Sequence, residues 1–392
     1  MYLNNPPLRS RADYDVIVVG GRVAGAATAM LLAQRGMRVV VLDQSAAGSD
    51  ALSTHALMRA GVLQLSRWGV LDDIVAAGTP PITRTTFTYA RERVVIDLKS
   101  AHGVDALFAP RRTLLDSVLV MAANRAGAEV HHRASVADVV RQNGRVVGVR
   151  AVTSDDRVVE LRAPLVIGAD GIRSSVARLV EAPFSHIAEH AMASSYGYWS
   201  NLPTDGYEWV FRADACSGVI PTNDGQACVF AAATPGRIGR GGVELIEEIV
   251  RAGSPEIAER LRRATPPRGT RTWSGHHGYI RRSAGPGWAL VGDAGYFKDP
   301  ISAHGLTDAL RDAELLARAV VDGFGDDSDL AEALASYEDT RNRLSLPLFD
   351  IVDRIASQRW DDGDIGRLLI GLSGAMNDEL EMLDALEGDP VS

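Results

Sequence analysis

The sequence contains few cysteines, almost no lysine and no concentrated basic segment. Only Cys216 and Cys228 occur in 392 residues, so the chain is not a disulfide scaffold. Lysine occurs only at positions 99 and 298, and no run of Lys or Arg exceeds two residues. The formal net charge is −9, whereas a nucleic-acid partner requires a concentrated basic face. We therefore expect no nucleic-acid partner.

The two cysteines flank a predicted hairpin around Asp224-Gly225. A two-residue turn there would place Cys228 opposite Pro221, and Cys216 would lie five residues further along that strand. A strand advances roughly 3.4 Å per residue, so this separation is too long for a disulfide. We predict two unreactive free thiols.

Long apolar runs are also absent. No stretch approaches the roughly 20 apolar residues that a membrane-spanning helix needs. Residues 1–13 contain Pro6, Pro7, Arg9 and Arg11, but they lack the apolar segment of a signal peptide. We expect a cytoplasmic protein without a membrane span.

The first clear structural pattern in the sequence is a βαβ unit. Residues 14–19 form an apolar run that is typical of a strand buried on both faces. A glycine turn follows at 20–25, then a predicted helix over 26–35 and a strand over 37–42 that ends in Asp43. In such units the glycines allow a tight turn near a pyrophosphate, and the acid accepts a hydrogen bond from a ribose hydroxyl. Arg22 stands where the usual pattern has its second glycine, and its guanidinium could also contact a phosphate.

The sequence pattern changes twice in the rest of the chain. Residues 112–125 predict a helix, and residues 134–152 predict a hairpin around Asn143-Gly144. Between about 183 and 280, clustered aromatic residues and alternating patterns indicate an antiparallel sheet in a second domain. The predicted division is a discontinuous α/β domain over 14–80, 100–182 and 281–325, a second, β-sheet domain over 81–99 and 183–280, and a helical region over 326–392.

Two distant segments identify the cofactor. Residues 166–178 contain Asp170-Gly171, which resembles the Asp-Gly motif of the p-hydroxybenzoate hydroxylase fold. Residues 289–295 contain Asp293 and resemble the Gly-Asp motif of that fold, with Pro300 and Gly305-Leu306-Thr307 following. With the glycine turn, the chain resembles the FAD-dependent superfamily that includes class A flavoprotein monooxygenases and geranylgeranyl reductases. The resemblance implies an α/β fold: a Rossmann-type, glutathione-reductase-like FAD-binding domain, interrupted by an antiparallel β-sheet substrate domain and followed by C-terminal helices.

The resemblance also implies a role for each matching residue. The glycine turn would face the pyrophosphate, Asp43 the adenosine ribose and Val136 the adenine. Arg59 would run under the flavin, Arg112 would contact the phosphate and ribityl region, and Asp293 would bind the ribityl chain. The full predicted FAD set is Gly20, Gly21, Ala24, Gly25, Asp43, Arg59, Arg112, Val136, Asp170, Gly171, Asp293, Pro300, Gly305, Leu306 and Thr307.

Several reactions fit this family. Our main expectation is an NAD(P)H-dependent monooxygenase that inserts one oxygen from O₂, by hydroxylation or epoxidation, into a small aromatic or polycyclic apolar substrate through a C4a-hydroperoxyflavin. The candidate catalytic residues are His55, Tyr198, His276 and His277. A geranylgeranyl-type reductase is the alternative, which Asp299-Pro300 favours because hydroxylases often carry two prolines there. A non-catalytic FAD-binding protein also stays open.

Two further features of the sequence concern metal ions and the source of electrons. The Trp-x-Trp-x-Ile-Pro signature of flavin halogenases is absent, and so are zinc-ligand spacings, so we expect no metal. No second dinucleotide-binding unit is visible. Electrons would therefore come from NAD(P)H that binds transiently, or from a separate flavin reductase.

Overall fold

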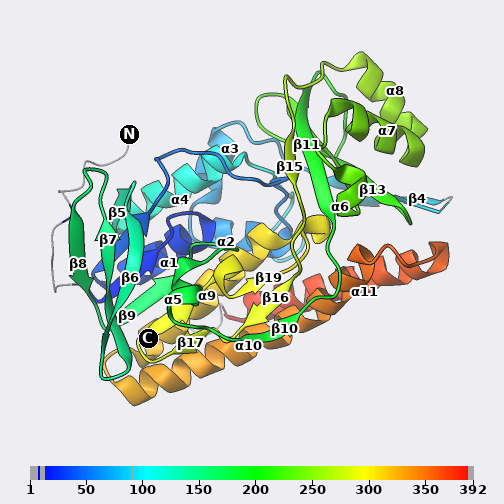
Figure 1. Ribbon diagram of the computed structural model, residues 1–392. Coiled ribbons are helices and arrows are strands. Elements are labelled where there is room, and N and C mark those ends of the chain that lie inside the picture. The colour runs from blue at the N-terminus through cyan, green and yellow to red at the C-terminus, as the bar shows by residue number, and fades with distance from the viewer. Residues whose placement is uncertain (1–7, 9–13, 91, 387–392) are drawn as a thin grey trace.

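The computed structural model describes residues 8, 14–90 and 92–386, and Figure 1 shows their arrangement. The prediction that residues 1–13 are not a signal peptide stays a prediction, because these residues, apart from Leu8, lie outside the described residues.

A six-stranded sheet forms the core of the first half of the molecule. Four of its five parallel strands are buried throughout, which explains their largely apolar sequences, whereas the parallel edge strand at 129–132 is only partly buried and contains Glu and His. Helices α1 (Val23–Gln34), α4 (Arg112–Ala126) and α9 (Gly305–Gly323) pack on one face, and a three-stranded sheet covers the other. The strand order is β17 (Ala284–Gly285), β18 (Trp288–Leu290), β9 (Leu165–Gly168), β1 (Val16–Val19), β2 (Val39–Asp43) and β5 (Glu129–His132), with β17 antiparallel.

The covering sheet contains the predicted hairpin. Strands β6 (Ser135–Gln142) and β7 (Arg145–Val152) pair across Asn143 and Gly144, and β8 (Val158–Arg162) extends the sheet. Both turn residues have positive φ, 51° and 78°, as a two-residue turn of this kind requires. This prediction is confirmed.

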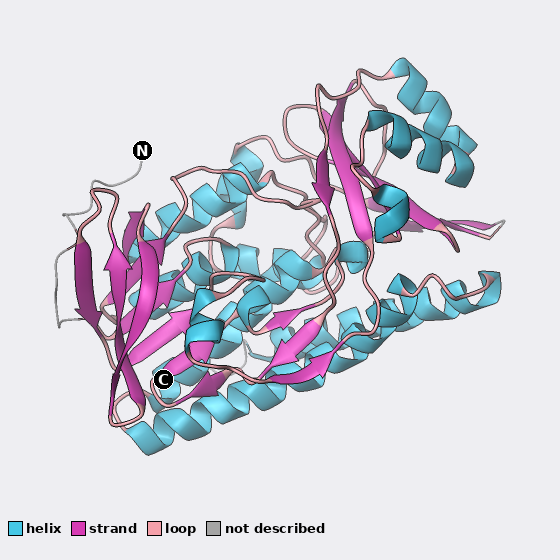
Figure 2. Cartoon of the chain, in the orientation of Figure 1, coloured by secondary structure: helices cyan, strands magenta, loops and turns pink. Residues whose placement is uncertain are grey.

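A seven-stranded sheet forms the second half of the molecule, at the upper right of Figures 1 and 2. It is antiparallel apart from one parallel pair, β3 with β12. The short helices α6 (Pro235–Ile238), α7 (Val243–Gly253) and α8 (Pro255–Arg263) cover its outer face. The strand order is β15 (Arg271–Trp273), β11 (Ala193–Ser200), β14 (Gln226–Ala233), β13 (Ala215–Pro221), β12 (Tyr207–Arg212), β3 (Arg84–Tyr89) and β4 (Glu92–Asp97).

The register of the β13–β14 hairpin differs from the prediction by one residue. Cys228 lies opposite Ile220, not Pro221, and Cys216 lies opposite Ala232. The turn contains three residues, since Pro221 pairs with Ala227 and the backbone of Thr222 bonds to Gln226. Both cysteines are free and buried, as predicted.

Long C-terminal helices join the two halves. Helix α10 (Asp327–Ala356) runs along the lower edge in Figure 1, and α11 (Asp362–Ala385) packs against the inner face of the seven-stranded sheet. Near its end, α11 reaches α2 (Arg59–Arg67), which α3 (Leu71–Ala76) follows. Among the described residues, no helix combines the length and the apolarity that crossing a bilayer requires. The remaining elements are α5 (Ser175–Leu179), β10 (Phe184–Ile187), β16 (Tyr279–Arg281), β19 (Tyr296–Phe297) and the short 3₁₀ turns at Gly292–Ala294 and Pro300–Ser302.

Candidate cofactor and substrate site

A cavity of about 580 Å³ lies between the two large sheets. Gly20, Asp43 and Asp170 line it at or within two residues of the carboxyl ends of β1, β2 and β9. Ligands of open α/β sheets bind outside these strand ends, and cavities of this volume hold cofactors and small molecules. The cavity is therefore the candidate site.

The cavity gathers most of the predicted FAD set from distant parts of the chain. The predicted members that line it are Gly20, Ala24, Asp43, Arg112, Val136, Asp170, Gly171, Asp293, Pro300, Gly305 and Leu306.

Four predicted members do not line this cavity, and each has another structural role. The Gly21 N–H donates to Asp43 Oδ2 over 2.7 Å, and a Cβ on Gly25 would lie 1.9 Å from the Gly20 carbonyl oxygen. Thr307 Oγ1 accepts from the Met58 N–H over 3.1 Å and so anchors the start of α2. Arg59 donates to three backbone carbonyls, those of Lys99, Ala101 and Val104. These carbonyls turn its guanidinium toward the loop at 99–104.

Two helix N-termini open onto the cavity, and neither has a side-chain cap. At α1 the residue before the helix is Arg22, and at α9 it is His304. Ala24, Gly305 and Leu306 line the cavity at these ends. Free N–H groups and a partial positive charge favour anionic ligand groups there. A ligand with a pyrophosphate and a second electron-rich edge fits this arrangement, so the residues present fit FAD.

Asp43 is preorganised at the end of β2. Its Oδ2 accepts from the Gly21 N–H over 2.7 Å, and its Oδ1 accepts from the Ser45 N–H over 2.6 Å. The carboxylate is thereby fixed toward the cavity wall. Each oxygen keeps acceptor capacity for a hydroxyl group.

Arg112 and Arg22 converge on a second carboxylate, that of Asp116. Arg112 Nε lies 3.0 Å from Asp116 Oδ1, and Arg22 NH1 lies 3.4 Å from Oδ2. Burial raises the pKa of Asp116, while the two arginines oppose that rise. Both arginines line the cavity, so two positive charges face it near the α1 N-terminus.

Asp293 is exposed to the cavity, which it lines, although protein surrounds it on the other sides. The surrounding protein desolvates the carboxylate and raises its pKa to about 6, while the positive charges of Lys298 and Arg112 oppose the rise. The Tyr279 hydroxyl fixes the backbone here, since it donates to the Asp293 carbonyl over 2.6 Å. Asp293 is thus a rigidly placed acceptor in the cavity wall.

The end of the cavity nearest the seven-stranded sheet is apolar and aromatic. Leu52, Tyr196, Trp273 and Phe297 line it. The Tyr196 hydroxyl accepts from the Ser53 N–H over 3.0 Å, which ties the loop after β2 to β11. Ser53, Thr54, His55 and Ser194, which neighbour these residues in the sequence, also line the cavity.

The four candidate catalytic residues separate into two groups. His55 lines the cavity and its Nε2 lies 2.5 Å from the Tyr198 hydroxyl, which is one layer further out. His276 and His277 do not line the cavity. Both are exposed, and their Nδ1 atoms lie within hydrogen-bond distance of the carbonyls of His277 and Ala188. Their positions give no support to a role in catalysis.

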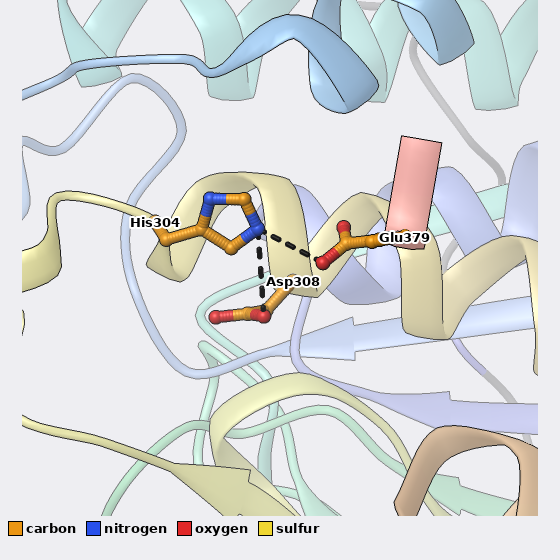
Figure 3. Close-up of side chains that lie close together, drawn as sticks. All are labelled: His304, Asp308 and Glu379. Carbon is orange, nitrogen blue, oxygen red and sulfur yellow. Dashed lines mark hydrogen bonds and ion pairs between the residues drawn. The ribbon is translucent and has the colours of Figure 1, made fainter. Parts of the chain in front are cut away.

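A buried charge cluster that the sequence did not reveal lies beneath the cavity, at the start of α9 (Figure 3). Lys298 pairs with Asp308, and both also line the cavity. Arg311 NH1 lies 3.0 Å from Asp308 Oδ1 and 3.3 Å from Glu379 Oε2, while His304 Nε2 lies 3.0 Å from the same Glu379 oxygen. Each of these side chains is at most 6% exposed. The cluster connects the cavity to α11.

The same cluster brings together His304, Asp308 and Glu379, three side chains of metal-ligating type. Lys298 and Arg311 already neutralise the carboxylates, and their charges would repel a cation. We therefore interpret the cluster as an ion-pair network. Burial and the nearby Arg311 together lower the pKa of Lys298 to about 7, although the surrounding carboxylates oppose the shift.

Comparison with known proteins agrees with this geometry. A family model described as an FAD binding domain matches residues 13–349. Among curated proteins, a digeranylgeranylglycerophospholipid reductase of Methanothrix thermoacetophila is 26% identical over 342 residues, covering 83% of this chain and 82% of that protein. Reductase 1 of the same name from Methanopyrus kandleri is 26% identical over 395 residues, covering 95% of this chain and 96% of that protein.

Solved structures share the fold at lower identity. The flavin-dependent brominase Bmp2 superposes with a TM-score of 0.81 at 18% identity, covering 95% of this chain and 93% of that chain. The probable FAD-dependent monooxygenase pqsL of Pseudomonas aeruginosa has a TM-score of 0.76 at 21% identity, covering 93% and 99%. The family match, which spans both large sheets and the cavity, shows that this chain belongs to the FAD binding domain family and is an FAD-dependent oxidoreductase.

Proposed function

We propose that this protein is an FAD-dependent reductase that saturates carbon–carbon double bonds in an apolar, isoprenoid-type substrate. The observation that carries the proposal is the extent of its similarity to digeranylgeranylglycerophospholipid reductases, up to 95% of this chain. The apolar end of the cavity supports it, because Leu52, Trp273 and Phe297 suit a hydrocarbon chain.

Monooxygenation, our main expectation from the sequence, has weaker support. The brominase Bmp2, the probable monooxygenase pqsL and the halogenase CndH are 18%, 21% and 22% identical to this chain, so their similarity shows the fold alone. The second candidate function is therefore oxygen insertion at the same site, and the product distinguishes the two.

Different residues of the cavity would bind different parts of FAD. The N-terminus of α1, with Arg22 and Arg112, would hold the pyrophosphate, and Asp43 would accept from the ribose. Asp293 would accept from the ribityl chain, and the N-terminus of α9 would face the electron-rich edge of the flavin. When bound, FAD would supply a hydride after reduction by NAD(P)H or by a separate flavin reductase.

The test is the mass of the product. The purified protein is given FAD, a chemical or enzymatic source of electrons, and a digeranylgeranylglycerophospholipid. The proposal predicts products heavier by two hydrogens for each double bond. A gain of one oxygen atom would instead establish monooxygenation, and an unchanged lipid would exclude this substrate class.

A further inference from the structure

His55 has three features that are unusual for a buried histidine. It is 1% exposed and lines the cavity, yet its backbone adopts a positive φ of 72°. Such a conformation is strained for a residue other than glycine, and strain of this kind is concentrated at functional sites. Its Nδ1 is buried and has no hydrogen-bond partner among the described residues. A group held in the cavity would supply that partner.

The other ring nitrogen is occupied by a tyrosine from the seven-stranded sheet. Nε2 lies 2.5 Å from the Tyr198 hydroxyl, and the two rings stack with centroids 5.6 Å apart. Within the described part of the chain, the Tyr198 hydroxyl has no other hydrogen-bond partner. A phenol is a better donor than acceptor when only one partner is present and a cation lies at its ring, so we assign the proton of this bond to Tyr198.

That cation is Arg111. Its guanidinium carbon lies 3.5 Å from the Tyr198 ring centroid, and NH1 donates to Gln226 over 3.1 Å. No described carboxylate lies within ion-pair distance of Arg111, and its Nε is buried without a partner. Burial raises the pKa of Tyr198, and the positive charge of Arg111 opposes that rise. Arg111 thus compensates a negative charge that would appear on Tyr198.

The charges around His55 fix its own protonation state. Burial lowers the pKa of His55 well below its usual value, and Arg111, Arg112 and Arg271 lower it further. Asp50 pairs with Arg271 over 2.8 Å, which leaves the local balance positive. His55 is therefore neutral and carries one proton, and with Nε2 accepting from Tyr198 that proton is on Nδ1.

We propose that His55 is the proton donor of the reduction and that Tyr198 and Arg111 are its positioning residues. His55 Nδ1–H breaks as a C–H bond forms on the substrate, and the Tyr198 hydroxyl proton moves to Nε2. The phenolate left on Tyr198 faces Arg111. Between turnovers it takes the proton back from Nε2 while Nδ1 gains a proton from water, which restores the starting tautomer of His55. This proton and the hydride from the reduced cofactor are the two hydrogens that the substrate gains. The inference depends on the proposed function for the identity of the substrate. The arrangement of His55, Tyr198 and Arg111 does not depend on it.

The first test therefore needs no substrate. In protein labelled with ¹⁵N-histidine, the His55 signals are identified by their loss in His55→Gln. The relay predicts a neutral ring with Nδ1 protonated from pH 6 to 8. A ring protonated on Nε2, or a charged ring, overturns it whatever the substrate is.

The second test uses variants with the digeranylgeranylglycerophospholipid probe. Tyr198→Phe should lower kcat by about 10²–10⁴-fold with little change in KM, as loss of a proton-transfer group does. Arg111→Gln should lower kcat less and shift its pH dependence, and FAD content should stay normal in both. Tyr207→Phe is the matched control, since Tyr207 is a buried tyrosine that donates to the Phe108 carbonyl over 2.7 Å.

Equal kcat in Tyr198→Phe and the Tyr207→Phe control would refute the relay. If the wild-type protein itself reduces no double bond, the proposed function fails. The ¹⁵N measurement of which His55 ring nitrogen carries the proton still tests the relay.

Discussion

At the scale of single residues, the cavity holds a carboxyl group in surroundings that disfavour its ionised form. Asp293 has a pKa of about 6 in the folded chain against 3.8 for the free side chain. The folded protein therefore holds more protons than the unfolded chain between these values, so this group's contribution to stability falls as pH rises through the window. Such residues are retained where a ligand needs them.

Asp293→Asn should separate these two effects. Without FAD, the variant should unfold at a higher temperature than wild type above about pH 6, and the advantage should shrink toward pH 4. Its FAD affinity should fall about tenfold, because a charge-assisted hydrogen bond becomes a neutral one. Thermal unfolding across pH and titration with FAD measure both. A difference in midpoint that does not vary with pH would contradict the assignment.

Residues also show where sequence reasoning ends. Asp43 and Asn143-Gly144 were predictable because a strand end and a tight turn are local features. The register of Cys228 was wrong by one residue, because sequence alone did not distinguish a two-residue turn from a three-residue turn. Arg59 matched a motif, but its partners are carbonyls about 40 residues further along the chain.

At the scale of elements, the glycine turn depends on close packing between β1 and α1. A Cβ on Gly25 would lie 1.9 Å from the Gly20 carbonyl oxygen, which real structures do not tolerate. Gly374 offers the contrast, since it is exposed within α11 and has open space around it.

Gly25→Ala should therefore destabilise the protein by about 1–3 kcal/mol or more and abolish FAD binding. Gly374→Ala should stabilise it by about 0.5–1 kcal/mol and leave FAD binding unchanged. Urea unfolding and flavin content after purification test both. Normal FAD loading in Gly25→Ala would show that the turn is not required in this form.

At the scale of the whole molecule, α11 completes the structure beneath the cavity although it lies beyond the matched residues 13–349. Glu379 from this helix meets Arg311 and His304 from α9 and the residue before it. The sequence predicted a helical region over 326–392, but not how its helices dock. Contacts between residues 68 and 75 positions apart leave no local signal in one sequence.

Arg311→Met should destabilise the folded protein by about 3–5 kcal/mol, because it leaves the buried Asp312 without its cation and removes one of the partners of Asp308 and of Glu379. Arg367→Ala on α11 is the control, since its pair with Asp364 is on the surface and should not change the unfolding midpoint measurably. Urea unfolding compares the two variants. Equal midpoints would mean that the network does not hold α11 in place.

The central claim, reduction without oxygen, is tested most directly by a single turnover under argon. The flavoprotein is reduced with dithionite, freed of excess reductant and mixed with a digeranylgeranylglycerophospholipid. The account predicts that the absorbance of oxidised flavin returns as the lipid gains hydrogen, with no oxygen present. Flavin that stays reduced until air is admitted, and a lipid that then gains oxygen, would contradict it.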